Sequence, residues 1–402
     1  MHIIEKFEWG KYVSPFSDRN TAPFNWYAFK HRFGSGLVSN VFETFGLSKG
    51  DYVFDPYNGG GTTTIKAKIE GYNSIGMDIS PFSVFLTNAL INDYDIERLK
   101  KATKMISHRI KPHVVIPDVA LLRKAFSEKT LKYLYSLREE INNLTCPDKS
   151  FFLLCLLSIL DKASRAKKSG GFLRITDQKM ASPSEVREMF LKTMNVYMDN
   201  LDSFAYSDMN AKAVIGDARR FPDEIKKMQF DAILTSPPYP NRHDYTRIYE
   251  LELLVGFIKD NDSLKALRYN TLRSHVEAKE RYKAEGYDTP AKLVRIVDTL
   301  QKHELNNPQI INTLTGYFED MFLSLREMKD VLRPGGKIGL VVSNVRFAGV
   351  MIPVDELLAE IGEQAGLNLK NIYLLRYRGN SSQQMKEFNR QPSRESIIFW
   401  EK

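Results

Sequence analysis

The stretch Phe230-Asp231-Ala232-Ile233-Leu234-Thr235-Ser236-Pro237-Pro238-Tyr239 sets the organisation of this 402-residue chain. Its apolar first half, with the β-branched Ile233, predicts a buried parallel strand. That strand ends abruptly at a polar residue, two prolines and an aromatic ring. Because proline fixes φ and donates no backbone N–H, the carbonyls around Pro237 and Pro238 are available to face a ligand. The sequence therefore predicts a strand that stops at a rigid, functional loop.

Tyr239 adds a flat face beside these acceptors, which suits stacking on a planar base. A ring for stacking and acceptors for an exocyclic amine are what methylation of a nucleobase amino group requires. The stretch Ser236-Pro237-Pro238-Tyr239 resembles the catalytic motif of the amino-methylating DNA methyltransferases, the N4-cytosine and N6-adenine enzymes, in which Ser, Asp or Asn precedes Pro-Pro-Tyr or Pro-Pro-Phe. The resemblance implies that these four residues are catalytic. The alternative is a Pro-Pro turn with a packing tyrosine, so partners elsewhere in the chain decide between the two.

A glycine-rich loop is the second strong signal, in Asp51-Tyr52-Val53-Phe54-Asp55-Pro56-Tyr57-Asn58-Gly59-Gly60-Gly61-Thr62-Thr63-Thr64-Ile65. Glycine allows positive φ and a close approach of the backbone to a ligand. The spacing differs from the Gly-x-Gly-x-x-Gly of dinucleotide sites, which receive a pyrophosphate. S-adenosylmethionine carries no phosphate, and an acidic strand end facing its cationic amino-acid group fits better. A plain glycine-rich turn between strand and helix is the alternative.

This loop resembles the Asp-Pro-Phe-x-Gly-x-Gly-Thr-Thr cofactor loop of the same methyltransferases, with Tyr57 in place of Phe. The resemblance implies a set of residues that bind S-adenosylmethionine: Asp55, Pro56, Tyr57, Gly59, Gly61, Thr62 and Thr63. In the same family, a His/Arg-Phe stretch and a helix just before this loop help to close over the methionine end of the cofactor. Residues 30–46 match that position, and Gly46 suits the end of a helix.

Two later strands are also predicted to end in acids. Asp78 lies 23 positions after Asp55, the distance at which an acid meets ribose hydroxyls in a strand–turn–helix–strand unit. We expect Asp78 to bind the ribose and Ile79 to contact the adenine, although Asp78 also suits a helix N-cap. The resemblance implies that Asp217, followed by Ala218, hydrogen-bonds the cofactor adenine.

The acid-ended strands and the Pro-Pro loop together predict the fold class. Four strand ends along one edge of a parallel sheet indicate an α/β domain, a doubly wound, Rossmann-like S-adenosylmethionine-dependent methyltransferase sheet. The rhythm of strand and helix stops twice, which indicates mainly helical insertions. We expect the following segments: 1–96, an N-terminal arm and the cofactor-binding half of the core; 97–210, a basic helical insertion for DNA or target recognition; 211–258, core with the catalytic loop; 259–314, a second helical insertion; and 315–402, the C-terminal part of the core.

Charge points to a polyanionic partner. The chain has a formal net charge of +8, and residues 97–210 hold 20 Lys or Arg against 13 Asp or Glu. Clustered bases beside small residues and an aromatic ring are typical of a loop that follows phosphates, although a charge run also occurs on solvated faces. We expect double-stranded DNA contacts from the following residues: Arg165, Lys167, Lys168, Arg242, Arg247 and Arg346.

Composition excludes several classes of protein and site. The two cysteines, Cys146 and Cys155, form no CxxC pair, which disfavours a zinc site, and no metal is expected. Neither lies in the Pro-Pro loop, where methylation of a cytosine ring carbon would need a thiol. The apolar run Phe151 to Leu160 is too short for a bilayer, and no signal sequence opens the chain, so a cytoplasmic protein without membrane contact is expected.

These features predict a site-specific DNA methyltransferase that acts on the N4 amine of cytosine, because Ser in the first motif position is more typical of N4-cytosine enzymes in the resembled family. The alternatives are an N6-adenine DNA methyltransferase, an RNA guanine-N2 methyltransferase and a catalytically silent nucleic-acid-binding protein. A restriction–modification role, with a cognate restriction endonuclease as partner, is a further expectation.

Overall fold

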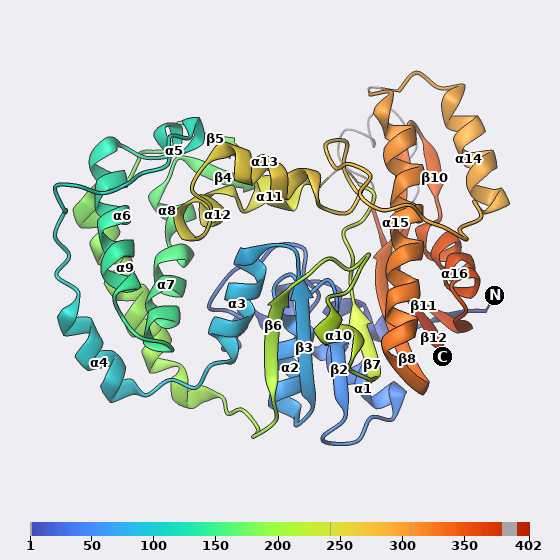
Figure 1. Ribbon diagram of the computed structural model, residues 1–402, viewed down its shortest axis with the longest axis horizontal. Helices are drawn as coiled ribbons and strands as arrows, with labels where there is room; N and C mark the ends of the chain where they lie inside the picture. The colour runs from blue at the N-terminus through green and yellow to red at the C-terminus, as the bar shows by residue number, and fades with distance from the viewer. Residues whose placement is uncertain (1, 242, 306, 380–391) are drawn as a thin grey trace.

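The computed structural model describes residues 2–241, 243–305, 307–379 and 392–402. At its centre lies an eight-stranded sheet of order β1-β11-β12-β8-β7-β2-β3-β6 (Figure 1). The strands are β1 (Ile3–Glu5), β2 (Tyr52–Asp55), β3 (Asn73–Asp78), β6 (Ala211–Ile215), β7 (Phe230–Thr235), β8 (Leu332–Ser343), β11 (Asn368–Arg378) and β12 (Ser393–Glu401).

Five neighbouring strands of this sheet, from β6 through β3, β2 and β7 to β8, are parallel. Strand β12 runs antiparallel to both β8 and β11. The chain moves outward from β2 to β3 and β6, then returns to β7 on the other side of β2. The switch point therefore lies between β2 and β7, where open α/β sheets bind ligands. The predicted doubly wound, Rossmann-like methyltransferase sheet is confirmed.

Alternation along β7 explains why both faces of the sheet are covered. Ala232 and Leu234 belong to the buried cluster that contains α1 (Ser35–Phe45), whereas Ile233 belongs to the cluster with α15 (Gln309–Val331) and α16 (Val354–Gln364). Successive residues of a strand point to opposite faces, so an unbroken apolar run buries both. The remaining helices of the core are α2 (Thr62–Glu70), α3 (Pro81–Ile91) and α10 (Asp223–Lys226).

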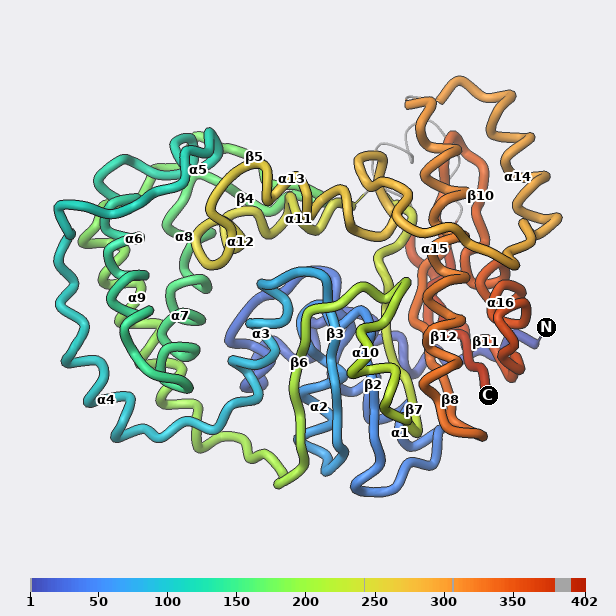
Figure 2. The backbone as a smooth tube through the Cα atoms, viewed as in Figure 1, coloured from blue at the N-terminus to red at the C-terminus, as the bar shows by residue number. Residues whose placement is uncertain are grey.

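The segment 97–210 forms a helical lobe beside the sheet (Figures 1 and 2). Its helices are α4 (Ile96–Met105), α5 (Ala120–Ala125), α6 (Glu128–Asn142), α7 (Asp148–Ser158), α8 (Leu160–Ala163), α9 (Pro183–Asp199) and the 3-10 turn η3 (Leu201–Ser203). The lobe also holds a two-stranded hairpin, β4 (Ala166–Ser169) and β5 (Phe172–Ile175), in the basic stretch where a loop was expected. Strands rather than a loop form there because the two short runs pair across Gly170 and Gly171.

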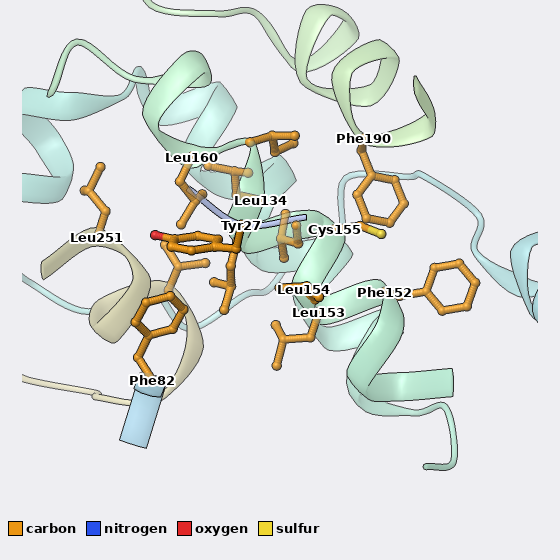
Figure 3. Close-up of a cluster of buried hydrophobic side chains, with 14 of the residues drawn as sticks. Tyr27, Phe82, Leu134, Phe152, Leu153, Leu154, Cys155, Leu160, Phe190 and Leu251 are labelled. Carbon is orange, nitrogen blue, oxygen red and sulfur yellow. The ribbon is translucent and has the colours of Figure 1, made fainter. Parts of the chain in front are cut away.

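A continuous apolar core joins the lobe to the sheet. Figure 3 shows Tyr27 of the N-terminal arm and Phe82 of α3 among leucines of the lobe. The two rings meet edge to face with centroids 5.1 Å apart. Helix α12 (Glu250–Gly256), which follows the catalytic loop, adds Leu251 to the same cluster. The lobe therefore packs against the cofactor half of the core through a shared apolar cluster and is not joined to it by a linker alone.

The remaining elements are α11 (Tyr245–Ile248), α13 (Asn261–Tyr269), α14 (Ala291–Gln301), the hairpin β9 (Val345–Phe347) and β10 (Val350–Ile352), and the 3-10 turns η1 (Phe7–Tyr12) and η2 (Pro15–Asp18). The expected boundary between residues 314 and 315 falls inside α15, because Ile310 and Leu314 already belong to its buried face. None of the described helices combines the length and the apolar character needed to cross a membrane.

Candidate cofactor and target site

One cavity lies at the carboxyl ends of the parallel strands. Asp55 of β2, Asp78 of β3, Asp217 after β6 and Ser236 after β7 all line it. The sequence placed these four residues at one sheet edge, and the structure brings them to one cavity. The lining residues also include several expected cofactor and catalytic positions: Pro56, Tyr57, Gly59, Thr62, Ile79, Ala218 and Pro238.

Asp55 links the cofactor loop to the catalytic strand. Its Oδ1 accepts hydrogen bonds from the Thr235 hydroxyl at 2.6 Å and from the Tyr57 backbone N–H at 3.2 Å. Burial raises the pKa of Asp55 to about 7, although these hydrogen bonds act in the opposite direction. A carboxyl group held this way in a cavity wall gains from a cationic partner, because such a partner offsets the cost of burying its charge.

The glycine loop has the backbone that its composition predicts. Gly61 has φ of +76°, and a Cβ atom there would lie 2.3 Å from the Thr87 hydroxyl. Thr63 does not line the cavity; its hydroxyl donates to the Leu234 carbonyl at 3.2 Å and ties α2 to β7. Gly61 and Thr63 thus shape the loop, whereas Gly59 lines the cavity and donates its backbone N–H to Asp78 Oδ2 at 2.8 Å.

The hydrogen bonds that hold Asp78 within the described residues come from backbone donors. Besides Gly59, the Ser80 N–H donates to its Oδ1 at 2.8 Å. Burial raises the pKa of Asp78 to about 6, opposed by these backbone hydrogen bonds. The alternative role as N-cap of α3 is wrong, because Ser80 caps that helix through its own side chain. Asp78 therefore presents a fixed carboxyl group to the cavity.

Asp217 also lines the cavity, but its carboxylate pairs with two arginine side chains. Arg219 donates from Nε to Oδ1 at 2.9 Å and from Nη2 to Oδ2 at 2.8 Å, and Arg281 Nη1 lies 3.2 Å from Oδ2. Arg219 further pairs with the buried Asp320 at 2.9 Å, as does Arg273 at 2.7 Å. This network, which the motifs did not reveal, ties the second insertion to the wall of the cavity.

Ser236 and Tyr239 contact each other at the start of the catalytic loop. The Ser236 hydroxyl donates to the Val341 carbonyl at 3.0 Å, and the Tyr239 hydroxyl lies 3.3 Å from Ser236 Oγ. Pro237 and Tyr239 are not part of the cavity wall, and the Tyr239 ring packs against the buried cluster around α15. Because the Ser236 proton is used on Val341, its oxygen keeps lone pairs for an incoming N–H donor.

Several cavity residues come from outside the glycine loop and the Ser-Pro-Pro-Tyr motif. The N-terminal arm adds Phe29, the expected closing segment adds His31, Arg32 and Phe33, and the residues after the catalytic loop add His243, Tyr245 and Tyr249. The second insertion adds Leu267, Asn270, Thr271, Leu272, Ser274 and His275. The stretch 267–275 shows no periodic or compositional signal in the sequence.

Lys168 does not fit the expected DNA contact. Its side chain is only 4% exposed, and Nζ lies 2.6 Å from Glu252 Oε1 and 2.9 Å from Asp161 Oδ2. Burial lowers the pKa of Lys168, but attraction to Glu252 and Asp161 outweighs it, so the net pKa is raised. The charge of Lys168 is therefore used inside the protein, which is a correction to the prediction from the charge run.

The other expected DNA contacts differ in exposure. Lys167 is exposed, and Arg165 is partly exposed, with Nε on the Thr176 carbonyl at 3.0 Å. Arg247 is 45% exposed but pairs with Glu277 at 2.6 Å and Asp244 at 3.4 Å. Arg346 is buried, with Nη1 3.3 Å from the Gly349 carbonyl, which argues against a direct phosphate contact. Arg242 lies outside the described residues.

Comparison with known proteins gives a consistent result. No protein-family model matches the chain. The chain is 34% identical to the Type II methyltransferase M.BsoBI of Geobacillus stearothermophilus, across 100% of this chain and 90% of that protein. It is 25% identical to the Type II methyltransferase M.AvaI of Nostoc sp., across 98% of this chain and 89% of that protein.

Among solved structures, a TehB-like SAM-dependent methyltransferase from Corynebacterium glutamicum aligns at 10% identity and a TM-score of 0.30, across 91% of this chain and 85% of that one. That likeness is too weak to add to the fold argument, which rests on the strand order. The sheet, the cavity at its switch point and the full-length similarity to M.BsoBI agree. The chain belongs to the type II DNA methyltransferases, and its cofactor is S-adenosylmethionine.

Proposed function

We propose that the protein transfers the methyl group of S-adenosylmethionine to the exocyclic N4 amine of cytosine at a specific sequence in double-stranded DNA. The observation that carries this proposal is the Ser236 hydroxyl, which lines the cavity while it donates to the Val341 carbonyl. An oxygen held in this way accepts from an amine N–H. Serine in this position is, in the resembled family, more typical of N4-cytosine enzymes than of N6-adenine enzymes.

The residues at the other end of the cavity fit the cofactor. Asp55 offers a buried carboxyl group for the cationic amino-acid end, and Asp78 offers oxygens for the ribose hydroxyls. Ile79 and Ala218 add apolar surface for the adenine ring beside Asp217. Gly59 and Gly61, with Pro56, Tyr57, Thr62 and Thr63, shape the loop around these groups. The cofactor supplies a methyl group that is bonded to a cationic sulfur, and this methyl group is readily transferred to a neutral nitrogen.

The chain positions the target for this transfer. The cytosine flips out of the duplex and donates from its amine to the Ser236 hydroxyl. Pro237 and Tyr239 do not line the cavity in the structure, so in this proposal the catalytic loop shifts on DNA binding, the Pro237 carbonyl accepts from the same amine and the Tyr239 ring stacks on the base. Both acceptors orient the nitrogen lone pair towards the methyl group. The N–CH₃ bond forms as the S–CH₃ bond breaks, and the extra amine proton then passes to solvent. Positioning supplies most of the acceleration, and no strong base is needed.

The experiment is incubation of the purified protein with radiolabelled S-adenosylmethionine and unmethylated bacterial DNA, followed by digestion to nucleosides and chromatography. We expect label on N4-methylcytosine. Label on N6-methyladenine keeps the mechanism and overturns the base assignment, whereas label only on added RNA replaces DNA as the substrate. Cofactor binding by calorimetry without any labelled nucleic acid supports the catalytically silent alternative.

Membership of the type II DNA methyltransferases also bears on which protein partner this chain has. A restriction–modification role implies a cognate endonuclease that cuts the same sequence and is blocked by the methyl group. We propose such a partner by analogy of function. Protection is the measurement: DNA methylated by this protein resists the endonuclease, and unmethylated DNA is cut.

A further inference from the structure

The β4–β5 hairpin has one face that is packed and one that is exposed. Lys167 pairs with Arg174 across the hairpin, and Ser169 pairs with Phe172. All four of these residues are exposed, whereas the intervening pairs, Ala166 with Ile175 and Lys168 with Leu173, are buried or partly buried. Alternation along both strands explains this division, because side chains i and i+2 share a face. The outward face thus presents two basic side chains, Lys167 and Arg174, and the aromatic ring of Phe172.

The two basic side chains on this face, Lys167 and Arg174, differ from Lys168 in their partners. Within the described part of the chain, no carboxylate forms an ion pair with Lys167 or Arg174, and like charges directly opposite each other destabilise a strand pair. Buried Lys168, one residue away, has two carboxylates. The two positive charges of Lys167 and Arg174 repel each other. A bound polyanion would relieve this repulsion, so the surface is suited to bind one.

Phe172 lies at the turn end of the face that carries this charged pair. Its side chain is 53% exposed, directly after the turn at Gly170 and Gly171. At Gly171 a Cβ atom would lie 2.7 Å from Cδ2 of His243, a residue that lines the cavity. The turn of the hairpin therefore lies against the segment that follows the catalytic loop, and Figure 1 shows β4 and β5 beside α11.

The hairpin is also fixed to the core. Lys168 joins it to Glu252 of α12 and to the Tyr27 hydroxyl at 2.8 Å, and Lys30 Nζ donates to the Lys168 carbonyl. Its outward face is therefore presented at a defined position relative to α12 and the N-terminal arm. A rigid element of this kind can deform a duplex at one chosen base pair.

We propose that the β4–β5 hairpin enters the DNA beside the target base, with Lys167 and Arg174 on the phosphates and Phe172 in the space that the flipped base leaves. Apolar side chains inserted between base steps stabilise unstacked DNA in this way. This assignment rests on the proposed DNA methylation. It makes Phe172 a positioning residue that acts on base flipping and not on the cofactor.

The test uses a synthetic duplex that carries a sequence methylated by the wild-type protein in bacterial DNA. We expect Phe172→Ala to slow single-turnover methylation by about 10- to 100-fold, the cost of losing support for one unstacked base. Calorimetric affinity for S-adenosylmethionine stays unchanged. A mismatch opposite the target, which lowers the cost of flipping, restores the rate to within about 3-fold of the wild type. Phe172→Trp, which keeps a ring, retains the wild-type rate.

Variants of α4, at the opposite end of the lobe in Figure 1, provide matched controls. Met105→Ala removes an apolar side chain that is 73% exposed, and we expect no change in rate. The affinity for the duplex falls as the salt concentration rises. We expect the double variant Lys167→Ala/Arg174→Ala to reduce the magnitude of the slope of log affinity against log salt by about 2, whereas the double variant of the exposed residues, Lys101→Ala/Lys104→Ala, leaves the slope unchanged.

The proposed insertion of Phe172 is overturned if Phe172→Ala methylates matched duplex at the wild-type rate. It is also overturned if the defect of this variant persists on mismatched DNA. If the wild type labels no DNA, the proposed function fails instead. The salt slopes need no methylation, so they still decide whether the hairpin contacts DNA.

Discussion

The cofactor end of the cavity and the β4–β5 hairpin hold their charged side chains in different ways. Asp78 is held by the backbone N–H groups of Gly59 and Ser80, and Asp55 by Tyr57 and the neighbouring strand. Lys168 is held by Asp161 of the same basic stretch and by Tyr27 and Glu252, which come from distant parts of the chain. Both acids end strands within short motifs, so the sequence reveals them even though Thr235 and Gly59 of other motifs help to hold them. A lysine that is buried against a distant carboxylate looks, in sequence, like any other member of a charge run.

The largest expected effect tests the hairpin end. Lys168→Met leaves the buried Glu252 without its cation, and we expect a loss of about 3–5 kcal/mol in the free energy of unfolding, measured with urea. The neighbouring Lys167→Met is the control, because an exposed lysine changes stability by about 0.5 kcal/mol or less. Equal losses in both variants would contradict the distinction between the buried and the exposed lysine.

A somewhat smaller effect tests the cofactor end. Gly61→Ala forces a Cβ atom to 2.3 Å from the Thr87 hydroxyl at φ of +76°, so we expect a loss of about 2–4 kcal/mol and weaker cofactor binding. Gly50→Ala, at φ of +91° with nothing within 4 Å, serves as the control and costs only about 1–2 kcal/mol for its backbone. A Gly61→Ala variant as stable as the control would show that the loop tolerates a side chain.

The smallest effect concerns pH. Because burial raises the pKa of Asp55 to about 7, the carboxyl group is mostly protonated at pH 6 and mostly ionised at pH 8. Only the ionised form attracts the cationic end of S-adenosylmethionine, so we expect its affinity to fall about tenfold from pH 8 to pH 6. Calorimetry measures this fall, and Asp55→Asn should flatten it. An unchanged slope in that variant would assign the titration to another group, Asp78 first.

The same carboxyl group acts on folding with the opposite sign. A raised pKa means that the folded chain holds a proton that the unfolded chain loses above pH 4. The contribution of Asp55 to stability is therefore present at low pH and decreases as the pH rises from about 4 to 7. Weak stability and strong cofactor binding at pH 8 are thus two results of one buried acid.

The sequence was informative wherever the determinants are local. Strand-end acids, the glycine loop and the Ser-Pro-Pro-Tyr motif each lie within a few residues, and parallel strands bring their ends to one edge. Helix α1 ends at Gly46 with φ of +67°, as its glycine predicted. The pairing of β1 with β11 and the Arg219–Asp320–Arg273 network could not be predicted, because each depends on residues far apart in the chain. The second insertion similarly lines the cavity through residues 267–275, which carry no local signal.

The division of one cavity into a cofactor end and a target end is tested most directly by two variants and two measurements. Asp55→Asn and Ser236→Ala are compared for calorimetric affinity for S-adenosylmethionine and for single-turnover methylation of DNA with the cofactor at saturation. We predict that Asp55→Asn weakens cofactor binding, and that Ser236→Ala binds the cofactor normally but methylates at least about 100-fold more slowly. Loss of cofactor binding in Ser236→Ala, or wild-type methylation by that variant, would contradict the assignment of Ser236 to the target.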